Sequence, residues 1–321
     1  MSNVSVLIPT FKRPELLGEA IDSCLNQSCK PFEILVGDDS PDDLTQLKIN
    51  AYQSKSNVPI KYKHNVPSLN QAGNINMLFQ EAKGDKIILL HDDDLLVSTA
   101  IETLLNCFHL NPDIDIAYGK QYIISQNGEI DYHSSEKLNR GYFRTSETEG
   151  CKLNSLEAGI LQQFPNDGYM LDAKVIKHIQ YRNYSDIGFI GDGCEYDFGI
   201  LVGQYRFKTY FVNSYTAKYR VTMESMSTNP NSNFAYYAFK ILENVDLPKN
   251  YEVMKSKKLS EISPIAIVQV IYSKSGNYQN EALRIYFSKY HRMKIFSLGG
   301  IRRFFIILYC ILNSSFFSKK I

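Results

Sequence analysis

Several sequence features that mark common enzyme classes are missing from this chain of 321 residues. It has no GxxxxGK, no GxGxxG after the first predicted strand, no GxSxG and no HExxH. These absences argue against P-loop phosphoryl transfer, dinucleotide redox chemistry, and serine or zinc hydrolysis. The six cysteines include no CxxC pair, which predicts reduced and mostly buried thiols. Because no fixed-period repeat and no long polar tract occurs, repeat and disordered architectures are excluded as well.

Long apolar runs are also lacking. The run at 304–312 has nine residues, whereas a membrane-spanning helix needs about 20. Arg302 and Arg303 precede this run, and Lys319 and Lys320 follow it. We therefore predict that residues 295–321 form a basic amphipathic helix that associates with a membrane surface. The alternative is a helix that packs on the core or in a dimer.

Acidic residues are absent from one end of the chain, although the formal net charge is only +1. Residues 282–321 contain eight Lys or Arg and no Asp or Glu, and the other residues have 27 basic against 34 acidic side chains. Nucleic acid is thus a poor partner for the acidic body, and an anionic membrane suits the basic tail. No signal-peptide pattern precedes Pro9, so we expect a cytoplasmic protein, peripheral on the inner face of the cell membrane.

What the sequence does contain is an alternation of strand and helix patterns. Apolar, β-branched runs predict strands at 4–8, 32–36, 60–63, 86–90 and 114–118, and helical patterns at 14–27, 70–82 and 98–109 separate them. This order predicts an α/β fold with a mostly parallel central sheet that helices cover on both faces, and such sheets bind ligands at the carboxyl ends of their strands. Later segments are predicted as a hairpin turn at Asn127-Gly128, helices at 154–163 and 195–203, a strand at 209–212, a linker at 229–233 and a C-terminal helical extension.

Two acidic clusters follow predicted strands. Gly37-Asp38-Asp39-Ser40 comes after the second strand, and His91-Asp92-Asp93-Asp94 comes after the fourth. A pair of like charges 4 Å apart costs about 4 kcal/mol at an effective dielectric constant of about 20. A divalent cation with oxygen ligands relieves that repulsion, and Mg²⁺ is typically shared between carboxylates and substrate phosphates. The clusters thus predict a metal and a diphosphate ligand, the alternative being a solvated acidic turn that caps the next helix.

These segments, together with 4–13 and 84–94, resemble the successive motifs of family 2 glycosyltransferases with the GT-A fold, over about residues 1–227. The resemblance implies transfer of a sugar from a nucleotide diphosphate sugar with inversion, assisted by Mg²⁺ or Mn²⁺. It implies that Asp93, with Asp94, holds the metal, and that His91 stands where many relatives carry an acid. His91 then either supports the metal ligands without binding the metal itself or is simply a polar residue at the end of the strand. By position, the nucleotide-binding residues are Pro9, Thr10, Arg13, Asp38, Asp39 and Asp92.

The same resemblance extends more loosely to later segments. Gly193–Phe198 resembles a helix start whose central acid is the catalytic base, which implies Glu195 as the base, with Asp192 and Asp197 as rivals, unless these acids only cap the helix. Residues assigned to donor or acceptor binding are Asp167, Gly168 and Arg220, the last of which would neutralise phosphate. Thr222 stands where relatives frequently have a histidine. If relatives use that histidine on the metal or diphosphate, Thr222 lacks its nitrogen.

The resemblance as a whole implies an inverting hexosyltransferase that uses a nucleotide diphosphate sugar, with UDP the expected carrier. The acceptor is expected to be a hydroxyl group of a glycan or of a saccharide linked to polyprenyl diphosphate, in O-antigen, capsule or other bacterial surface-polysaccharide assembly. Two alternatives remain: a sugar-phosphate nucleotidyltransferase, or a catalytically silent nucleotide-binding scaffold at the membrane. A homo-oligomer is left open. The predicted parts are a nucleotide-sugar-binding half at 1–120, an acceptor and catalytic half at 121–228, a helical extension at 229–294 and the membrane-associating segment at 295–321.

Overall fold

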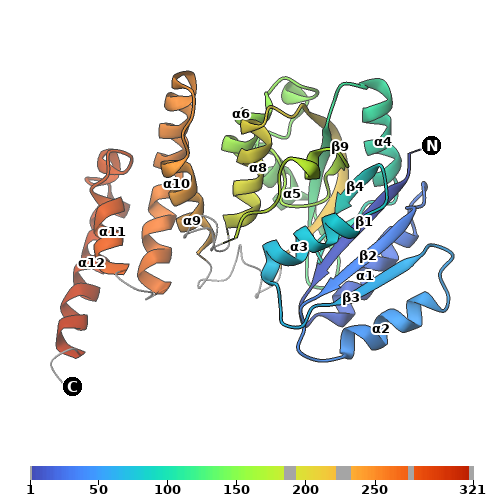
Figure 1. The fold of residues 1–321 in the computed structure, drawn as a ribbon. Coiled ribbons are helices and arrows are strands. Elements are labelled where there is room, and N and C mark those ends of the chain that lie inside the picture. Colours follow the sequence, from blue (N-terminus) through green and yellow to red (C-terminus); the bar gives the residue numbers. More distant parts are fainter. Residues whose placement is uncertain (1, 184–192, 222–232, 274–277, 318–321) are drawn as a thin grey trace. The chain divides into compact units, whose positions relative to one another are not determined.

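The computed structural model describes residues 2–183, 193–221, 233–273 and 278–317 (Figure 1). Two compact units divide the chain, one made of Met1–Arg182 with Phe198–Thr222, the other of Asn183–Asp197 with Met223–Ile321. The strands of the first unit are β1 (Val4–Thr10), β2 (Glu33–Asp38), β3 (Ile60–His64), β4 (Lys86–Leu89), β5 (Leu95–Leu96), β6 (Ile116–Ile124), β7 (Ile130–Asp131), β8 (Met170–Asp172) and β9 (Thr209–Arg220). Its helices include α1 (Pro14–Leu25), α2 (Leu44–Gln53), α3 (Asn70–Glu81), α4 (Ala100–Leu110), α5 (Tyr132–Gly141) and α6 (Ser155–Leu161). The helix α8 (Cys194–Gln204) has residues in both units.

One nine-stranded sheet organises the first unit, in the order β3-β2-β1-β4-β8-β6-β9-β5, with β7 beside β6. The strands β3, β2, β1 and β4 are parallel, as predicted, because the helices α1, α2 and α3 connect them and return the chain to the same edge. Antiparallel β8 then joins β4 to β6. The fold is the α/β class expected from the sequence, and helices flank the sheet (Figure 1).

The core of this unit explains why the short apolar runs form buried strands. Alternate residues of neighbouring strands, such as Val6, Ile34 and Ile88, enter one cluster together with Leu17 and Ile21 of α1. On β1 the intervening residue Leu7 is equally buried, and α3 packs against β1 and β2. Both faces of these strands are therefore covered, which accounts for continuous rather than alternating hydrophobicity.

Two predicted strands are longer than expected. The segment predicted at 114–118 continues to Ile124, so that β6 includes the first arm of the predicted hairpin with β7. The segment predicted at 209–212 continues to Arg220. The register between β6 and β9 shifts near Lys120, where β9 accommodates extra residues around polar Asn213 and Ser214. This irregularity interrupts the strand pattern in the sequence but not the pairing itself.

The second unit is helical outside α8. Its helices are α9 (Phe234–Asn244), α10 (Glu252–Ser273), α11 (Tyr278–Tyr286) and α12 (Leu298–Phe317). Pro264 lies inside α10 and has no N–H for the carbonyl of Ser260, four residues before it. That carbonyl accepts hydrogen bonds from Ser263 Oγ at 3.0 Å and Lys294 Nζ at 2.5 Å. Among the described residues, no helix has the length and apolar content needed to cross a membrane.

Candidate functional site

Asp92 connects the carboxyl ends of β1 and β4. Its Oδ2 accepts hydrogen bonds from Thr10 Oγ1 at 2.7 Å and from the backbone N–H of Phe11 at 3.3 Å. Its Oδ1 lies 3.4 Å from Arg13 Nη1. Burial and the neighbouring Asp93 raise the pKa of Asp92 to about 6, against the opposing effect of Arg13. The end of β1 and the turn after β4, which the sequence motifs identified, are therefore joined by hydrogen bonds and an ion pair.

Arg13 also pairs with Asp93, at 2.7 Å between Nη1 and Oδ2. Burial lowers the pKa of Arg13, but the carboxylates of Asp92 and Asp93 outweigh burial and raise the pKa overall. Only 16% of the Asp93 side chain is exposed. The arginine thus offsets part of the negative charge that three successive carboxylates bring to this turn.

Asp94 lies deeper, and its two oxygens differ. Oδ1 accepts a hydrogen bond from the backbone N–H of Arg220 at 2.7 Å. Oδ2 is buried and has no hydrogen-bond partner among the residues that the structure describes. Burial, followed by the charges of Asp167 and Asp93, raises the pKa of Asp94 well above its ordinary value. An ionised buried oxygen without a donor is costly, unless a cation binds it.

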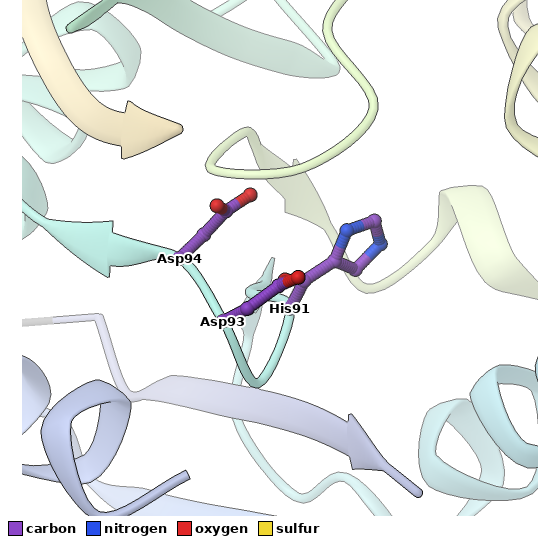
Figure 2. Close-up of side chains that lie close together, drawn as sticks. All are labelled: His91, Asp93 and Asp94. Atoms are coloured by element: carbon purple, nitrogen blue, oxygen red, sulfur yellow. The ribbon is translucent and has the colours of Figure 1, made fainter. Parts of the chain in front are cut away.

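His91, Asp93 and Asp94 lie together on the turn between β4 and β5, as Figure 2 shows. Each offers one ligand atom, and these atoms lie within 4.8 Å of one another. Carboxylate oxygens suit Mg²⁺ and Mn²⁺, and an imidazole nitrogen is a further ligand type for transition metals. The donor set and the buried Oδ2 of Asp94 therefore fit a divalent cation.

Arg220 supports this turn from the end of β9. Besides its N–H to Asp94, its guanidinium donates to the carbonyl of Asp93 at 2.8 Å and forms an ion pair of 2.6 Å with Glu19. It also donates to the carbonyls of Ser125 and Gln126. The side chain predicted to neutralise phosphate is thus buried and engaged in holding the turn.

Asp167 and Gly168, predicted to bind donor or acceptor, lie beside the same turn. Asp167 Oδ2 accepts a hydrogen bond from the backbone N–H of His91 at 3.0 Å, and its Oδ1 accepts one from Gln121 Nε2 at 3.1 Å. Gly168 donates its N–H to the carbonyl of Leu89 at 2.8 Å. Both residues therefore form hydrogen bonds with residues 89–91, which lead into the acidic turn.

A network of hydrogen-bonded polar side chains, which the sequence motifs did not reveal, contacts Asp167 through Gln121. Arg144 Nη1 donates to Gln121 Oε1 at 2.6 Å, and Arg144 Nε donates to the carbonyl of Gln163 at 2.8 Å. Burial lowers the pKa of Arg144 to about 10. In the sequence, Gln121 stands beside Lys120 inside a strand that is apolar at both ends, which is a weak signal for such a network.

The Asp38-Asp39 pair is also buried, at the end of β2. Asp38 accepts hydrogen bonds from Tyr62 Oη at 2.8 Å and from the N–H of Ser40. Oδ1 of Asp39 accepts hydrogen bonds from Asn65 Nδ2 and from the backbone N–H of Leu69, and its Oδ2 accepts one from Ser68 Oγ. The backbone N–H of Asp39 donates to the carbonyl of Thr10 at 3.0 Å. Asp39, Thr10, Asp92 and Arg13, four of the predicted nucleotide-binding residues, are thus linked by hydrogen bonds and an ion pair.

The predicted base lies on α8. Glu195 and Asp197 occupy its first turn, where Glu195 is partly exposed and Asp197 is fully buried. Pro9 is partly exposed near the end of β1. Asp192 and Thr222 lie outside the described residues.

Comparisons with known proteins agree with these motifs. The family "Glycosyl transferase family 2" matches residues 5–160. The GalNAc(5)-diNAcBac-PP-undecaprenol beta-1,3-glucosyltransferase of Campylobacter jejuni is 28% identical over 253 residues, which cover 76% of this chain and 75% of that protein. The UDP-Glc:alpha-D-GlcNAc-diphosphoundecaprenol beta-1,3-glucosyltransferase WfgD of Escherichia coli is 26% identical over 162 residues, which cover 50% of this chain and 62% of that protein.

A solved structure shares the fold. TarS 1-349 of S. aureus in complex with UDP-GlcNAc has a TM-score of 0.61 and 14% identity, and the match covers 88% of this chain and 81% of that one. In a longer TarS chain the match covers 55% of its length. At this level of identity the likeness concerns the fold only.

Proposed function

Because this chain belongs to the family 2 glycosyltransferases, we propose that it transfers a sugar from a UDP-sugar to a hydroxyl group of a polyprenyl-diphosphate-linked saccharide. Glycosyl transfer follows from the family. The donor is supported by the UDP-Glc in the name of one relative and the UDP-GlcNAc bound to a fold neighbour. The acceptor is supported by the undecaprenyl-linked saccharides in the names of two relatives.

The observation that carries the proposal for this site is the acidic turn. His91, Asp93 and Asp94 converge, and the buried Oδ2 of Asp94 has no donor among the described residues. Asp93 and Asp94 would hold Mg²⁺ or Mn²⁺, with His91 beside them. When bound, such an ion stabilises negative charge on the departing diphosphate.

The residues around the turn have separate proposed tasks. Pro9, Thr10 and Arg13 would line the nucleotide site with Asp38, Asp39 and Asp92. Arg13 pairs with Asp93 here and is one-third exposed, so it is a charge that a phosphate group can reach. Asp167 and Gly168 would contact donor or acceptor.

Inversion requires a base that takes the proton of the attacking hydroxyl. We assign this role to Glu195, on its place in the Gly193–Phe198 motif. Its partial exposure supports the choice over Asp197, which is fully buried. A carboxylate that remains reachable can accept a proton from a bound substrate, whereas a buried one first needs an opening.

The proposed setting is bacterial surface-polysaccharide assembly, of which O-antigen and capsule are examples. We propose that residues 1–120 bind the nucleotide sugar, that 121–228 bind the acceptor and catalyse transfer, and that 229–294 extend the enzyme. An acceptor with a polyprenyl chain lies in a bilayer, so the enzyme would work at the inner face of the cell membrane.

The test compares Asp93→Asn with Asp113→Asn, a control at an exposed aspartate that pairs with Lys208. Isothermal titration should show UDP binding that depends on Mn²⁺, and Asp93→Asn should weaken it at least about 10-fold, a loss of about 1.4 kcal/mol. Asp113→Asn should bind like the wild type. With donor panels and lipid-linked acceptors, the wild type should release nucleoside diphosphate and extend the glycan. Pyrophosphate release, or binding without turnover, would contradict the proposed reaction.

A further inference from the structure

The helix α12 exposes a second apolar face. Of the 21 large hydrophobic side chains that are exposed among the described residues, seven lie in 293–312. Five of them belong to α12 and define what we call its outer face: Leu298, Ile301, Phe305, Tyr309 and Leu312. Their exposed fractions range from 45% to 90%. Such a concentration differs from the scattered exposed apolar residues normal for a protein surface.

The spacing of these residues places them on one side of the helix. Successive members are three or four positions apart, and at 3.6 residues per turn they fall within an arc of roughly 80°. Phe296, just before the helix, is also exposed. The outer face is therefore a continuous apolar stripe along the helix.

The other side of α12 is already used inside the second unit. Tyr286 Oη of α11 donates to the carbonyl of Gly300 at 3.2 Å, and the Tyr286 and Phe304 rings stack with centroids 5.6 Å apart. Ile307 is buried, and Gln279 Nε2 donates to the carbonyl of Cys310. Rotating the helix to hide the outer face would expose these contacts. A surface helix needs one apolar face, and this one has two.

The segment that carries the outer face has charge of one sign. Arg302 is exposed between Ile301 and Phe305, and Arg292 is exposed before the helix. No Asp or Glu occurs from residue 282 to the end of the chain. A second copy that paired through the same face would bring positive patches together, because a two-fold interface matches a surface with itself. Positive charge beside an apolar stripe is complementary to an anionic lipid surface.

We propose that the outer face of α12 binds the surface of an anionic bilayer, with the helix parallel to the membrane plane. Leu298, Phe305 and Leu312 enter the boundary between headgroups and acyl chains, while Arg302 pairs with lipid phosphate. This inference adds a partner to the proposed action on a lipid-linked acceptor. Vesicle binding needs no sugar donor, so the two proposals fail separately.

The experiment is co-sedimentation of the full chain with vesicles of phosphatidylcholine and phosphatidylglycerol, against vesicles of phosphatidylcholine alone. The wild type should bind the anionic vesicles preferentially. Ile301→Ser combined with Phe305→Ser should reduce partitioning at least about 10-fold, because two large apolar side chains are removed. Arg302→Glu should abolish most of the preference for anionic lipid. All three side chains are exposed, so the variants should fold, as melting temperatures will verify.

Matched controls lie in the first unit. Leu110→Ser removes an apolar side chain that is 76% exposed, and Arg140→Glu reverses a charge whose side chain is 79% exposed. Both should bind vesicles like the wild type, and every variant should keep turnover on a soluble acceptor. Absence of vesicle binding by the wild type, or equal loss in the controls, would overturn the proposal. A dimer by light scattering that Ile301→Ser/Phe305→Ser dissociates, without vesicle binding, would overturn it in favour of a second copy.

Discussion

The backbone N–H of Arg220 donates to Oδ1 of Asp94 at 2.7 Å, across 126 residues of sequence. The Nε of the same arginine donates to the carbonyl of Asp93 at 2.8 Å. The last residue of β9 thus holds two consecutive residues of the turn that follows β4. Arg220 is a positioning residue for the candidate metal ligands.

Replacing Arg220 with lysine should destabilise the first unit and weaken binding of the metal. Lysine keeps the charge near Glu19 but cannot also donate to the carbonyls of Asp93 and Gln126. A hydrogen bond to a charged group contributes about 1.5–3 kcal/mol. We expect the free energy of unfolding to fall by about 2–4 kcal/mol, measured by urea denaturation.

Arg140→Lys is the control for this change, because its weak 4.0 Å pair with Glu136 lies on an exposed helix surface. It should alter neither stability nor Mn²⁺ affinity. The two effects of Arg220→Lys are separated by titrating Mn²⁺ with UDP at a temperature where the variant is fully folded. Unchanged Mn²⁺ affinity there would leave Arg220 with a purely structural role.

Glu195→Gln should abolish sugar transfer while leaving donor binding nearly intact. The amide cannot accept the proton of the acceptor hydroxyl, and general-base catalysis typically contributes 10²–10⁴-fold. We therefore expect kcat to fall at least about 100-fold and the Kd for UDP with Mn²⁺ to change little. Asp197→Asn is the comparison: if it, and not Glu195→Gln, shows this split, the base is Asp197.

Gly168→Ala should disturb the residues beside the acidic turn. Gly168 has a φ of +69°, and a Cβ at this position would lie 2.6 Å from the Cβ of buried Ala217. The strained backbone and this close contact should cost about 1–3 kcal/mol of stability, seen as a lower melting temperature. Gly141→Ala is the control, since a Cβ there meets nothing within 4 Å. Equal stability of the two variants would contradict the packing at Gly168.

Acidification should destabilise the second unit through His291. Its Nδ1 lies 2.8 Å from Ser263 Oγ, and the positive charges facing it are Arg303 and Lys294. Burial, then these two charges, lowers its pKa from 6.5 to about 4. The folded state therefore binds the proton less readily than the unfolded state does. Stability due to neutral His291 is complete above pH 6.5 and is lost as the pH falls from about 6.5 to about 4.

The measurement is the melting temperature from pH 7.5 to 4 for the wild type and for His291→Gln, which cannot take up a proton. The melting temperature of the wild type should fall further than that of the variant over this range. Carboxylates elsewhere titrate in both proteins, so only the difference between the two curves reports on His291. Parallel curves would show that His291 does not titrate as described.

Several elements and one cluster were predictable because their signals are local. Apolar runs such as the one around Ile88 identify buried strands, and the sheet brings their carboxyl ends to one edge. The family resemblance assigned Asp92, Thr10 and Arg13 to one nucleotide site, and Asp92 contacts both of the other residues. The extension of β9 to Arg220 was not predicted, because Asn213 and Ser214 interrupt its strand pattern.

By itself, the amino-acid sequence determined an α/β fold with acidic residues at the ends of β2 and β4, because periodicity and strand-end motifs are encoded in neighbouring residues. Only the tertiary structure decided which partner each carboxylate has: Arg220 for Asp94, Gln121 for Asp167, and the segment from Asn65 to Leu69 for Asp39. It also decided which side of α12 stays exposed. Hydrogen-bond partners and burial depend on segments that are distant in sequence and adjacent only after folding, so no local pattern specifies them.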